Sequence, residues 1–442
     1  MDKYKFKTKP YDHQLEALNE SCDRNQYALF MEMGCGKSKV VIDNFVYLYN
    51  NNKLNNVLIV APKGVYSTWV NKELQAHIPD DVEYEVVKWS SSHTKKFLKQ
   101  LENLFQYDKK LKILVMNIEA FSTKKGCQYA NKFIQANRTM FIIDESTTIK
   151  NPSAKRTQSC VRLGKYAHYR RILTGSPITK SPLDLYSQCM FLDPALLGFS
   201  SYYAFRARYA DMKEMTGQGR TFKFVTGYKN LDELNETLGK FSHRVLKKDC
   251  LDLPEKIYIR REIEMTPEQT KAYRELQKFA ATQLANNKLV TINHIMTQIV
   301  RLHQISCGFI GTDDGSITEL PNNRVSELSS ILEETDGKVI IWANYRHDIK
   351  RIEKLLIDIY GEDSVGTYYG DVPQERREYV INEFQNPDSP MRFFVGNTQT
   401  GGYGITLTAA KTVIYFSNNY DLEKRLQSED RAHRIGQTNK VT

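Results

Sequence analysis

The sequence has 442 residues, of which 41% are hydrophobic and 26% charged, a balance that excludes a disordered chain and allows sizeable buried cores. This length exceeds what one ordinary core can hold, so two domains are expected. The net charge of +10 fits a polyanionic partner, although many basic chains have neutral partners.

The cysteines and the apolar runs indicate an intracellular protein. Seven cysteines are scattered without a CxxC pair, which favours reduced thiols over a disulfide scaffold or a zinc finger. No apolar run is long enough to cross a bilayer, and the first ten residues, MDKYKFKTKP, lack the apolar segment of a secretory signal. We therefore expect a cytoplasmic location without membrane contact and leave a nuclear one open.

Short apolar runs rich in β-forming residues recur along the chain between segments of helical length. In the first half they are YALFMEM (27–33), NVLIVAPKG (56–64), KILVMNIEA (112–120), TMFIIDE (139–145) and YRRILTGSP (169–177). In the second half they are KVIIWANY (338–345), MRFFVGNTQ (391–399) and KTVIYFSN (411–418). This pattern predicts an α/β fold with parallel sheets covered on both faces, and ligands at the polar carboxyl ends of the strands.

The pattern changes between residues 183 and 335. Residues 184–240 are rich in Tyr, Phe, Lys and Arg and are expected to be helical or irregular. A helix is expected to begin at TPEQ, with Thr266 as its cap, Pro267 in first place and Gln269 closing a capping box. The stretch DLPEK (252–256) is a plausible hinge, so the two domains are predicted to span residues 1–250 and 251–442, with a helical segment at about 265–335 in the second.

A phosphate-binding loop is predicted directly after the first strand, in MEMGCGKSKV. Glycines let its backbone curl around phosphate oxygens, Lys37 supplies a positive charge and Ser38 a hydroxyl for Mg²⁺. The residues expected to hold the nucleotide here are Gly34, Cys35, Gly36, Lys37, Ser38 and Lys39. The strict pattern GxxxxGK[ST] fails at Met31, and the alternative is a simple glycine turn before a lysine-bearing helix.

Two further clusters carry chemistry. In FIIDES, Asp144 can hold Mg²⁺ and Glu145 can deprotonate an attacking water, whereas alone the pair could cap the next helix. In QSEDRAHRIGQ (427–437), Gln427, Arg431 and Arg434 follow i, i+4, i+7 spacing and would share one face of a helix. The alternative there is a surface helix with solvated arginines.

Taken in order, segments along nearly the whole chain resemble the motifs of superfamily 2 helicase-like ATPases, and within them the SWI/SNF-type DNA translocases. In the first half they are KPYDHQLEAL (9–18), EMGCGKS (32–38), LIVAPKGVYSTWVNKEL (58–74), DESTTIKN (144–151) and LTGSPITKSPLDLYS (173–187). Further on they are HRVLKKDCLDLPEK (243–256), MTQIVRLHQISCGF (296–309), IIWANYRHDI (340–349), TGGYGITLTAAKTVI (400–414) and QSEDRAHRIGQ. The last two are the most specific and favour this family over RNA helicases. The chain departs from the family at Thr147, where relatives more often have a histidine, and at Tyr420, where they often have a tryptophan.

The resemblance implies two tandem RecA-like domains with helical insertions, and ATP in the cleft between them. It implies that Gln14 pairs with the adenine edge and that Gly404 contributes to nucleotide binding. Arg431 and Arg434 would be arginine fingers, with Gln427 as their hydrogen-bonding partner and His433 either as their support or as a satisfied histidine. Tyr420 would couple the domains, touch DNA or pack in a core.

The resemblance also implies a function, an ATP-dependent translocase on double-stranded DNA that steps without sequence preference. The residues expected to grip the backbone are Pro62, Lys63, Asn344, Tyr345, Thr400, Gly401 and Gly402, although each could simply turn the chain. Alternatives are a strand-separating helicase, a DNA-binding protein that uses ATP only as a switch, and a motor subunit that remodels protein–DNA complexes for a partner bound at 184–240. We expect a monomer and a compact, bacterial or viral family member.

Overall fold

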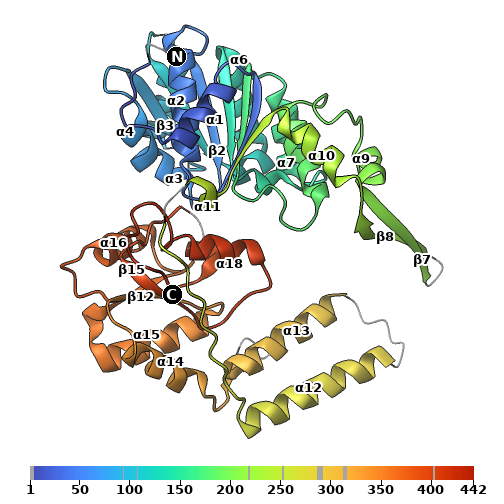
Figure 1. The fold of residues 1–442 in the computed structure, drawn as a ribbon, viewed down its shortest axis with the longest axis vertical. Coiled ribbons are helices and arrows are strands. Elements are labelled where there is room, and N and C mark those ends of the chain that lie inside the picture. Colours follow the sequence, from blue (N-terminus) through green and yellow to red (C-terminus); the bar gives the residue numbers. More distant parts are fainter. Residues whose placement is uncertain are drawn as a thin grey trace. The chain divides into compact units, whose positions relative to one another are not determined.

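The chain forms two compact units, Met1–Asp252 and Leu253–Thr442 (Figure 1). The computed structural model describes residues 4–442 except 93, 107, 218–219, 251–252, 286–291, 312–315 and 402–403. The predicted hinge at 252–256 therefore begins outside the described residues, and the domain bounds given above stay a prediction.

Unit 1 is built on a seven-stranded parallel sheet in the order β3-β4-β2-β5-β6-β1-β9. The strands are β1 Gln26–Met31, β2 Asn56–Ala61, β3 Tyr84–Lys88, β4 Leu111–Asn117, β5 Thr139–Asp144, β6 Tyr169–Leu173 and β9 Ser242–Val245. Five of them are the apolar runs of the first half of the sequence. Because β5, β6 and β1 are neighbours in a parallel sheet, the loops that follow them emerge side by side at one edge.

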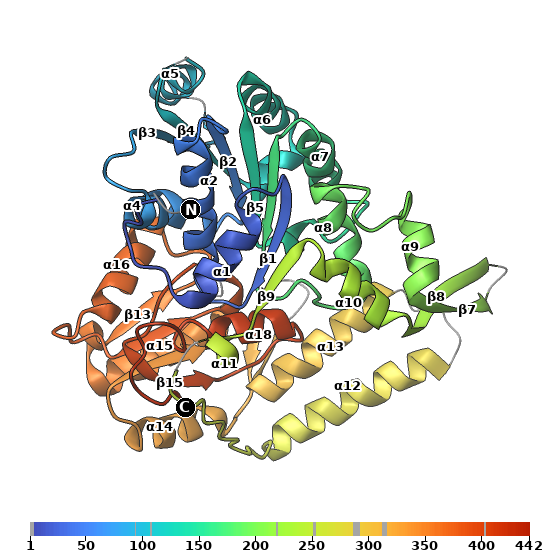
Figure 2. The ribbon, with the colours of Figure 1, turned by 45° about the horizontal axis from the view of Figure 1, so that its top comes forward.

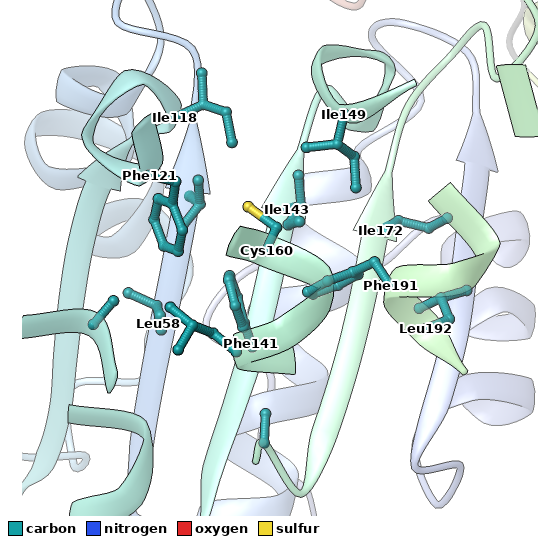
Figure 3. Packing of buried hydrophobic residues seen from close by; sticks show 14 of the residues in the cluster. Leu58, Ile118, Phe121, Phe141, Ile143, Ile149, Cys160, Ile172, Phe191 and Leu192 are labelled. Atoms are coloured by element: carbon teal, nitrogen blue, oxygen red, sulfur yellow. The ribbon is translucent and has the colours of Figure 1, made fainter. Parts of the chain in front are cut away.

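Helices cover both faces of this sheet, as the continuous apolar strands predict (Figures 1 and 2). One face packs against α1 Asp12–Ser21, α2 Lys37–Asn50, α3 Tyr66–Thr68, a π-helical turn Trp69–Glu73 and α4 Leu74–His77. The other packs against α5 Lys95–Leu104, α6 Lys124–Ala136, α7 Lys155–Gly164 and α8 Leu185–Leu192. On this second face the rings of Phe141 and Phe191 meet edge to face, with centroids 4.8 Å apart (Figure 3).

The composition of residues 184–240 predicts a helical or irregular segment, and this prediction is only partly correct. It contains α9 Tyr202–Tyr209, then the strands β7 Ala210–Gly217 and β8 Arg220–Tyr228, which pair antiparallel, and α10 Leu231–Gly239. The alternation of apolar and polar residues in TFKFV is the period-two signal that indicates this hairpin. After β9, the short helix α11 Lys247–Cys250 ends the described part of unit 1.

Unit 2 contains a four-stranded parallel sheet in the order β13-β14-β12-β15. The strands are β12 Lys338–Trp342, β13 Val365–Tyr368, β14 Phe393–Gly396 and β15 Ala410–Tyr415. One face packs against α14 Arg324–Glu333 and α15 Arg346–Tyr360, and the other against α16 Gln374–Gln385. The elements α17 Thr398–Gly401 and α18 Leu422–Glu429 flank β15 in sequence. The architecture is thus a pair of parallel α/β units of the RecA-like type. The apolar runs of the sequence do not predict β3, β9 and β13 of these two sheets.

The predicted capping box is present at the start of α12 Pro267–Ala285. The Thr266 N–H donates to Gln269 Oε1 (3.1 Å) and the Gln269 N–H donates to Thr266 Oγ1 (3.3 Å). The helix α13 Ile292–Cys307 follows, and then β10 Phe309–Gly311 and β11 Ile317–Glu319 form a short antiparallel pair. Among the described helices none is long and apolar enough to span a bilayer.

Candidate nucleotide site and phosphate-loop environment

The phosphate loop joins β1 to α2 and is shaped by two glycines. Gly34 has φ 88° and Gly36 has φ 85°, a left-handed conformation that favours glycine at both positions. Gly36 is the N-cap of α2, so the helix begins at Lys37 and presents the N–H groups of its first turn to the loop. These N–H groups have no partner within the helix and, with the helix dipole, form a place for an anion.

The three residues that follow Gly36 have different roles. The buried Lys37 ammonium donates to the carbonyl oxygens of Met31 (2.8 Å) and Glu32 (3.4 Å), which holds it against the loop. Ser38 lies half-buried in the first helical turn. Lys39 does not supply a charge to this site, because its buried ammonium pairs with Asp43 at 2.7 Å. Only the backbone N–H of Lys39 remains as a candidate phosphate contact.

Helix α1 supports the loop through Gln14. Its buried amide Nε2 donates to the Cys35 carbonyl (3.1 Å) and its Oε1 accepts from the Tyr11 N–H (3.1 Å). A Cβ at Gly36 would come within 2.1 Å of Gln14 Nε2, so this glycine is required for packing as well as for its φ. Gln14 is thus placed beside the loop, and its pairing with an adenine stays a prediction.

Helix α11, which lies at the carboxyl end of unit 1 in the sequence, contacts the same loop. The Lys247 N–H donates to Glu32 Oε2 at 2.8 Å, and the sulfurs of Cys35 and Cys250 lie 3.8 Å apart. All seven cysteines are free thiols, as the sequence indicates. The segment just before the boundary between the units therefore rests on the phosphate loop.

Asp144 and Glu145 lie at the carboxyl end of β5, and both are buried. The Trp69 indole Nε1 donates to Asp144 Oδ2 (2.9 Å), and the Glu145 N–H donates to Asp144 Oδ1 (3.0 Å). Burial, and then the neighbouring Glu145 carboxylate, raise the pKa of Asp144 to about 7, against the opposing effect of Trp69 and Lys37. Glu145 itself has φ 49° and ψ 60°, a left-handed conformation unusual for a residue with a side chain.

The residues present fit Mg²⁺ held mainly by water and phosphate. The buried Asp144 carboxyl is an oxygen ligand that a cation would return to its ionised form, and Ser38 offers a hydroxyl. In the described part of the chain, no group of three or more His, Cys, Asp or Glu side chains could hold a metal by itself. A magnesium ion here would bind through one carboxylate and the substrate, as is usual for this ion.

The loop after β6, TGSP at 174–177, packs between the other two. A Cβ at Gly175 would lie 3.1 Å from the Met33 nitrogen, so this glycine allows the close approach of the phosphate loop. The Gln188 side chain, from α8, accepts a hydrogen bond from Ser146 Oγ (2.6 Å) and donates one to the Pro177 carbonyl (2.8 Å). The three loops at this edge of the sheet are thereby joined into one structure.

In unit 2 the predicted helical face of Gln427, Arg431 and Arg434 is wrong. Helix α18 ends at Glu429, and both arginines lie in the turns that follow, because the Arg431 carbonyl accepts the Leu407 N–H (2.9 Å) instead of continuing the helix. The two guanidinium groups nevertheless converge. Arg431 Nη1 and Arg434 Nη1 donate to the same carbonyl, that of Ile405, at 3.2 and 3.4 Å.

Gln427 is a hydrogen-bonding partner of Arg431, but through its backbone, because Arg431 Nε donates to the Gln427 carbonyl at 2.9 Å. The Gln427 amide nitrogen donates to Glu423, and its buried Oε1 has no hydrogen-bond partner among the described residues. His433 Nε2 lies 2.7 Å from the Pro254 carbonyl, so this histidine anchors the first residues of unit 2. Tyr420 is 81% exposed, which excludes a place in a core, and its ring lies beside that of His303.

The residues expected to grip nucleic acid differ in exposure. In unit 1, Lys63 is exposed after β2, whereas Pro62 is buried and accepts hydrogen bonds from the turn. In unit 2, the Asn344 N–H donates to Ser417 Oγ (2.8 Å), and Tyr345 Oη lies 2.8 Å from His303 Nδ1.

The glycine-rich segment near 400 is only partly described. Thr400 is half-buried in α17. A Cβ at Gly401 would come within 2.5 Å of the Trp342 ring, so packing alone explains that glycine. Gly404 has φ 69°. Gly402 lies outside the described residues, and the contacts predicted for this segment stay predictions.

Sequence reasoning missed two residues of the unit 1 site. Nothing in YSTWVNKEL shows that the Trp69 indole meets Asp144, which is 75 positions away. Gln188 had a weak signal, since it is a lone amide in the apolar helix LYSQCMFL. A buried amide in such a helix needs partners and therefore indicates a specific contact.

Comparisons with known proteins identify the family. The chain matches the SNF2-related domain over residues 13–308 and the helicase conserved C-terminal domain over residues 323–436. It is 28% identical over 438 residues to a SWI/SNF-related matrix-associated actin-dependent regulator of chromatin subfamily A-like protein 1 homolog from Caenorhabditis elegans, covering 98% of this chain and 57% of that protein. It is 26% identical to an uncharacterized ATP-dependent helicase from Mycoplasma pneumoniae and 25% identical to the transcription regulatory protein SNF2 from Saccharomyces cerevisiae, with 93% of this chain covered in each case.

The chain spans 37% of the length of the Mycoplasma protein and 24% of the length of the yeast protein. Among solved structures, a Sulfolobus solfataricus SWI2/SNF2 ATPase core in complex with dsDNA aligns with 24% identity and a TM-score of 0.47, over 100% of this chain and 88% of that one. The match to the SNF2-related domain covers well over half of the sequence. The chain therefore belongs to the SNF2-related family, the SWI/SNF-type branch of the superfamily 2 helicase-like ATPases.

Proposed function

We propose that this chain hydrolyses ATP when stimulated by DNA and uses the hydrolysis to translocate along the duplex without sequence preference. The observation that carries the proposal is the meeting of three loops at one edge of the unit 1 sheet. Two of these loops place the Lys37 ammonium after β1 and the Asp144 and Glu145 carboxyls at the carboxyl end of β5, on the two sides of β6. A lysine cradle, a metal-binding carboxylate and a second carboxylate as base are the parts that phosphoryl transfer to water requires.

Each of these residues has a separate role in the proposed hydrolysis. Lys37 and the first N–H groups of α2 bind the β- and γ-phosphates, and Gln14 recognises the base. Asp144 and Ser38 hold Mg²⁺, which when bound neutralises the charge that develops on the phosphates. Glu145 accepts a proton from the attacking water, and its backbone N–H is held by Asp144 Oδ1.

The guanidinium groups of Arg431 and Arg434 are proposed as the fingers that act on the same phosphates. Arginine suits this role because it stays charged and binds phosphate oxygens bidentately. A finger typically contributes ~10³–10⁵ in rate. Arg434→Ala should lose most of the turnover while it keeps nucleotide affinity, measured by ATPase kinetics and by binding of a fluorescent ADP analogue. Lys440→Ala, which removes an exposed cation of the same unit, is the control. Unchanged turnover in Arg434→Ala would refute the finger role.

Double-stranded DNA is proposed as the track because one related structure is a SWI2/SNF2 ATPase core with dsDNA and because this chain has a net charge of +10. Contacts to the phosphate backbone carry no sequence information, so movement would be independent of sequence. Lys63, Asn344, Tyr345 and Thr400 remain the candidate contacts. We also propose a protein partner bound at 184–240, a monomeric state and a cytoplasmic location.

The decisive experiment compares ATP hydrolysis without nucleic acid, with single-stranded DNA, with duplex DNA and with RNA. Stimulation by the duplex, lost in Lys37→Ala and Glu145→Gln, is the expected result. Displacement of a third strand from a DNA triplex then measures translocation, and a forked duplex measures strand separation. A translocase displaces the third strand and leaves the fork intact. Displacement from the fork would favour the helicase alternative, and nucleotide-dependent DNA affinity without phosphate release would favour a switch.

A further inference from the structure

Gln188 joins two of the loops that form the proposed hydrolysis site, although it belongs to neither. Its amide oxygen accepts from Ser146 Oγ at 2.6 Å, and Ser146 directly follows Glu145. Its amide nitrogen donates to the Pro177 carbonyl at 2.8 Å and to the Asp184 carbonyl of its own helix start at 2.9 Å. Each polar atom of this side chain therefore has a partner, and the partners lie on three separate stretches of chain.

The surroundings of Gln188 make this bridge specific. The Gln188 and Ser146 side chains are both fully buried, and the rest of α8 is largely apolar. An apolar residue of similar volume would fill the same space without the cost of removing an amide from water. The amide thus fixes the direction and register of the two loops, which apolar packing would specify less well.

The bridge acts on a strained part of the site. Glu145 holds a left-handed backbone conformation, which persists only where the surrounding contacts determine it. Ser146 and Thr148 continue the chain, and the Thr148 N–H donates to the Glu145 carbonyl at 3.0 Å. On the other side of the bridge, Gly175 lies against the backbone of the phosphate loop. A continuous path of contacts therefore runs from the phosphate loop through Gln188 to Glu145.

We propose that Gln188 is a positioning residue that holds Glu145 in register with the phosphate loop, through its buried hydrogen bonds to Ser146 and Pro177. The expected loss of kcat rests on the proposed function, whereas the expected loosening of the two loops does not. Lys150, which donates to Thr179 Oγ1, gives a second connection between the same loops. The Gln188 bridge is the connection that reaches the residue next to Glu145.

The test uses Gln188→Leu, which keeps the volume and removes the bridge, and Ser146→Ala, which removes only the bond to Oε1. Both should lower kcat, Gln188→Leu by about tenfold or more, while the Kd for ADP stays within about threefold, because a small misplacement of a base slows chemistry more than binding. The double variant should be no slower than Gln188→Leu, since both changes break the same bridge. Ser187→Ala is the matched control. Ser187 immediately precedes Gln188 on α8, and its buried hydroxyl has no hydrogen-bond partner among the described residues.

A second measurement separates this inference from the proposed function. Hydrogen–deuterium exchange of the full chain should become faster at residues 144–150 and 174–180 in Gln188→Leu and in Ser146→Ala, but not in Ser187→Ala. Unchanged exchange in both segments would overturn the bridge whether or not the protein hydrolyses ATP. With active wild-type protein, a kcat of Gln188→Leu within about twofold of wild type would overturn the positioning role. If Gln188→Leu fails to fold, Ser146→Ala decides both questions.

Discussion

The buried guanidinium of Arg171 joins three parts of unit 1, which are the end of α1, helix α2 and the start of β1. Its side chain is fully buried in β6, and its three nitrogens donate to Asn44 Oδ1 (3.0 Å) and to carbonyl oxygens, including those of Ser21 (2.8 Å) and Arg24 (2.7 Å). All of these acceptors are neutral, so the charge is stabilised by dipoles from the end of α1, from α2 and from the start of β1.

Removal of this guanidinium should strongly destabilise unit 1. In Arg171→Leu several buried oxygens lose their donor, and we expect a loss of about 3–5 kcal/mol in the free energy of unfolding. The adjacent Arg170→Leu is the control, with an expected loss of about 1 kcal/mol, because Arg170 forms one ion pair with the half-exposed Asp193. Urea denaturation of the two variants measures the difference. Equal losses would show that burial alone, and not the hydrogen bonds of Arg171, determines stability here.

At the scale of single elements, the N-terminal segment is tied to α4 through a histidine that stays neutral. Thr8 Oγ1 and His77 Nδ1 lie 2.9 Å apart, and Lys7 pairs with Asp80 just beyond the helix. Burial, and then the nearby lysines, lower the pKa of His77 to about 4 from its ordinary 6.5. Between pH 6.5 and 4 the unfolded chain therefore binds a proton at His77 that the folded chain does not bind.

The stability of unit 1 should consequently fall as the pH drops through this window. His77→Gln keeps a polar partner for Thr8 but cannot be protonated, so it should lose less stability than wild type between pH 7.5 and 5. Thermal unfolding at the two pH values measures this, and His168→Gln, at an exposed position, is the control. If the stability of wild type and that of His77→Gln depend on pH in the same way, protonation of His77 is not the cause of the loss.

The sequence predicts the central strands of the two sheets better than the strands at their edges. Buried parallel strands such as β2 and β5 are continuous apolar runs, so the sequence indicates them clearly, along with the loops at their ends. Strands at sheet edges, such as β3 and β13, are short or half-exposed and carry little pattern. The end of α18 depends on the contact between Arg431 and Leu407, and the roles of Trp69 and Gln188 depend on tertiary contacts, none of which a local pattern contains.

At the scale of the whole molecule, the two units have separate cores. The clusters around Phe141 and Phe45 belong to unit 1, and those around Ile341 and Phe394 belong to unit 2. Two cores of this kind need not unfold together. Calorimetry should therefore show two transitions, of which Arg171→Leu lowers only the one of unit 1.

Nucleotide should act on the same transition. If nucleotide binds the folded phosphate loop as proposed, and not the unfolded chain, ADP at about 100 times its Kd should add about 2.7 kcal/mol to the stability of unit 1. Lys37→Ala should abolish this shift. A single transition would contradict the independent unfolding of the two cores, and an ADP effect that survives in Lys37→Ala would contradict the assignment of the nucleotide to the phosphate loop.

The contact between α11 and the phosphate loop has a mechanical consequence. Lys247 and Cys250 touch Glu32 and Cys35, and the backbone that continues into unit 2 leaves directly after this short helix. A displacement of the backbone that follows Cys250 would therefore act on Glu32 and Cys35 of the phosphate loop through these two contacts. Under the proposed function, the same displacement would change the affinity of this loop for nucleotide.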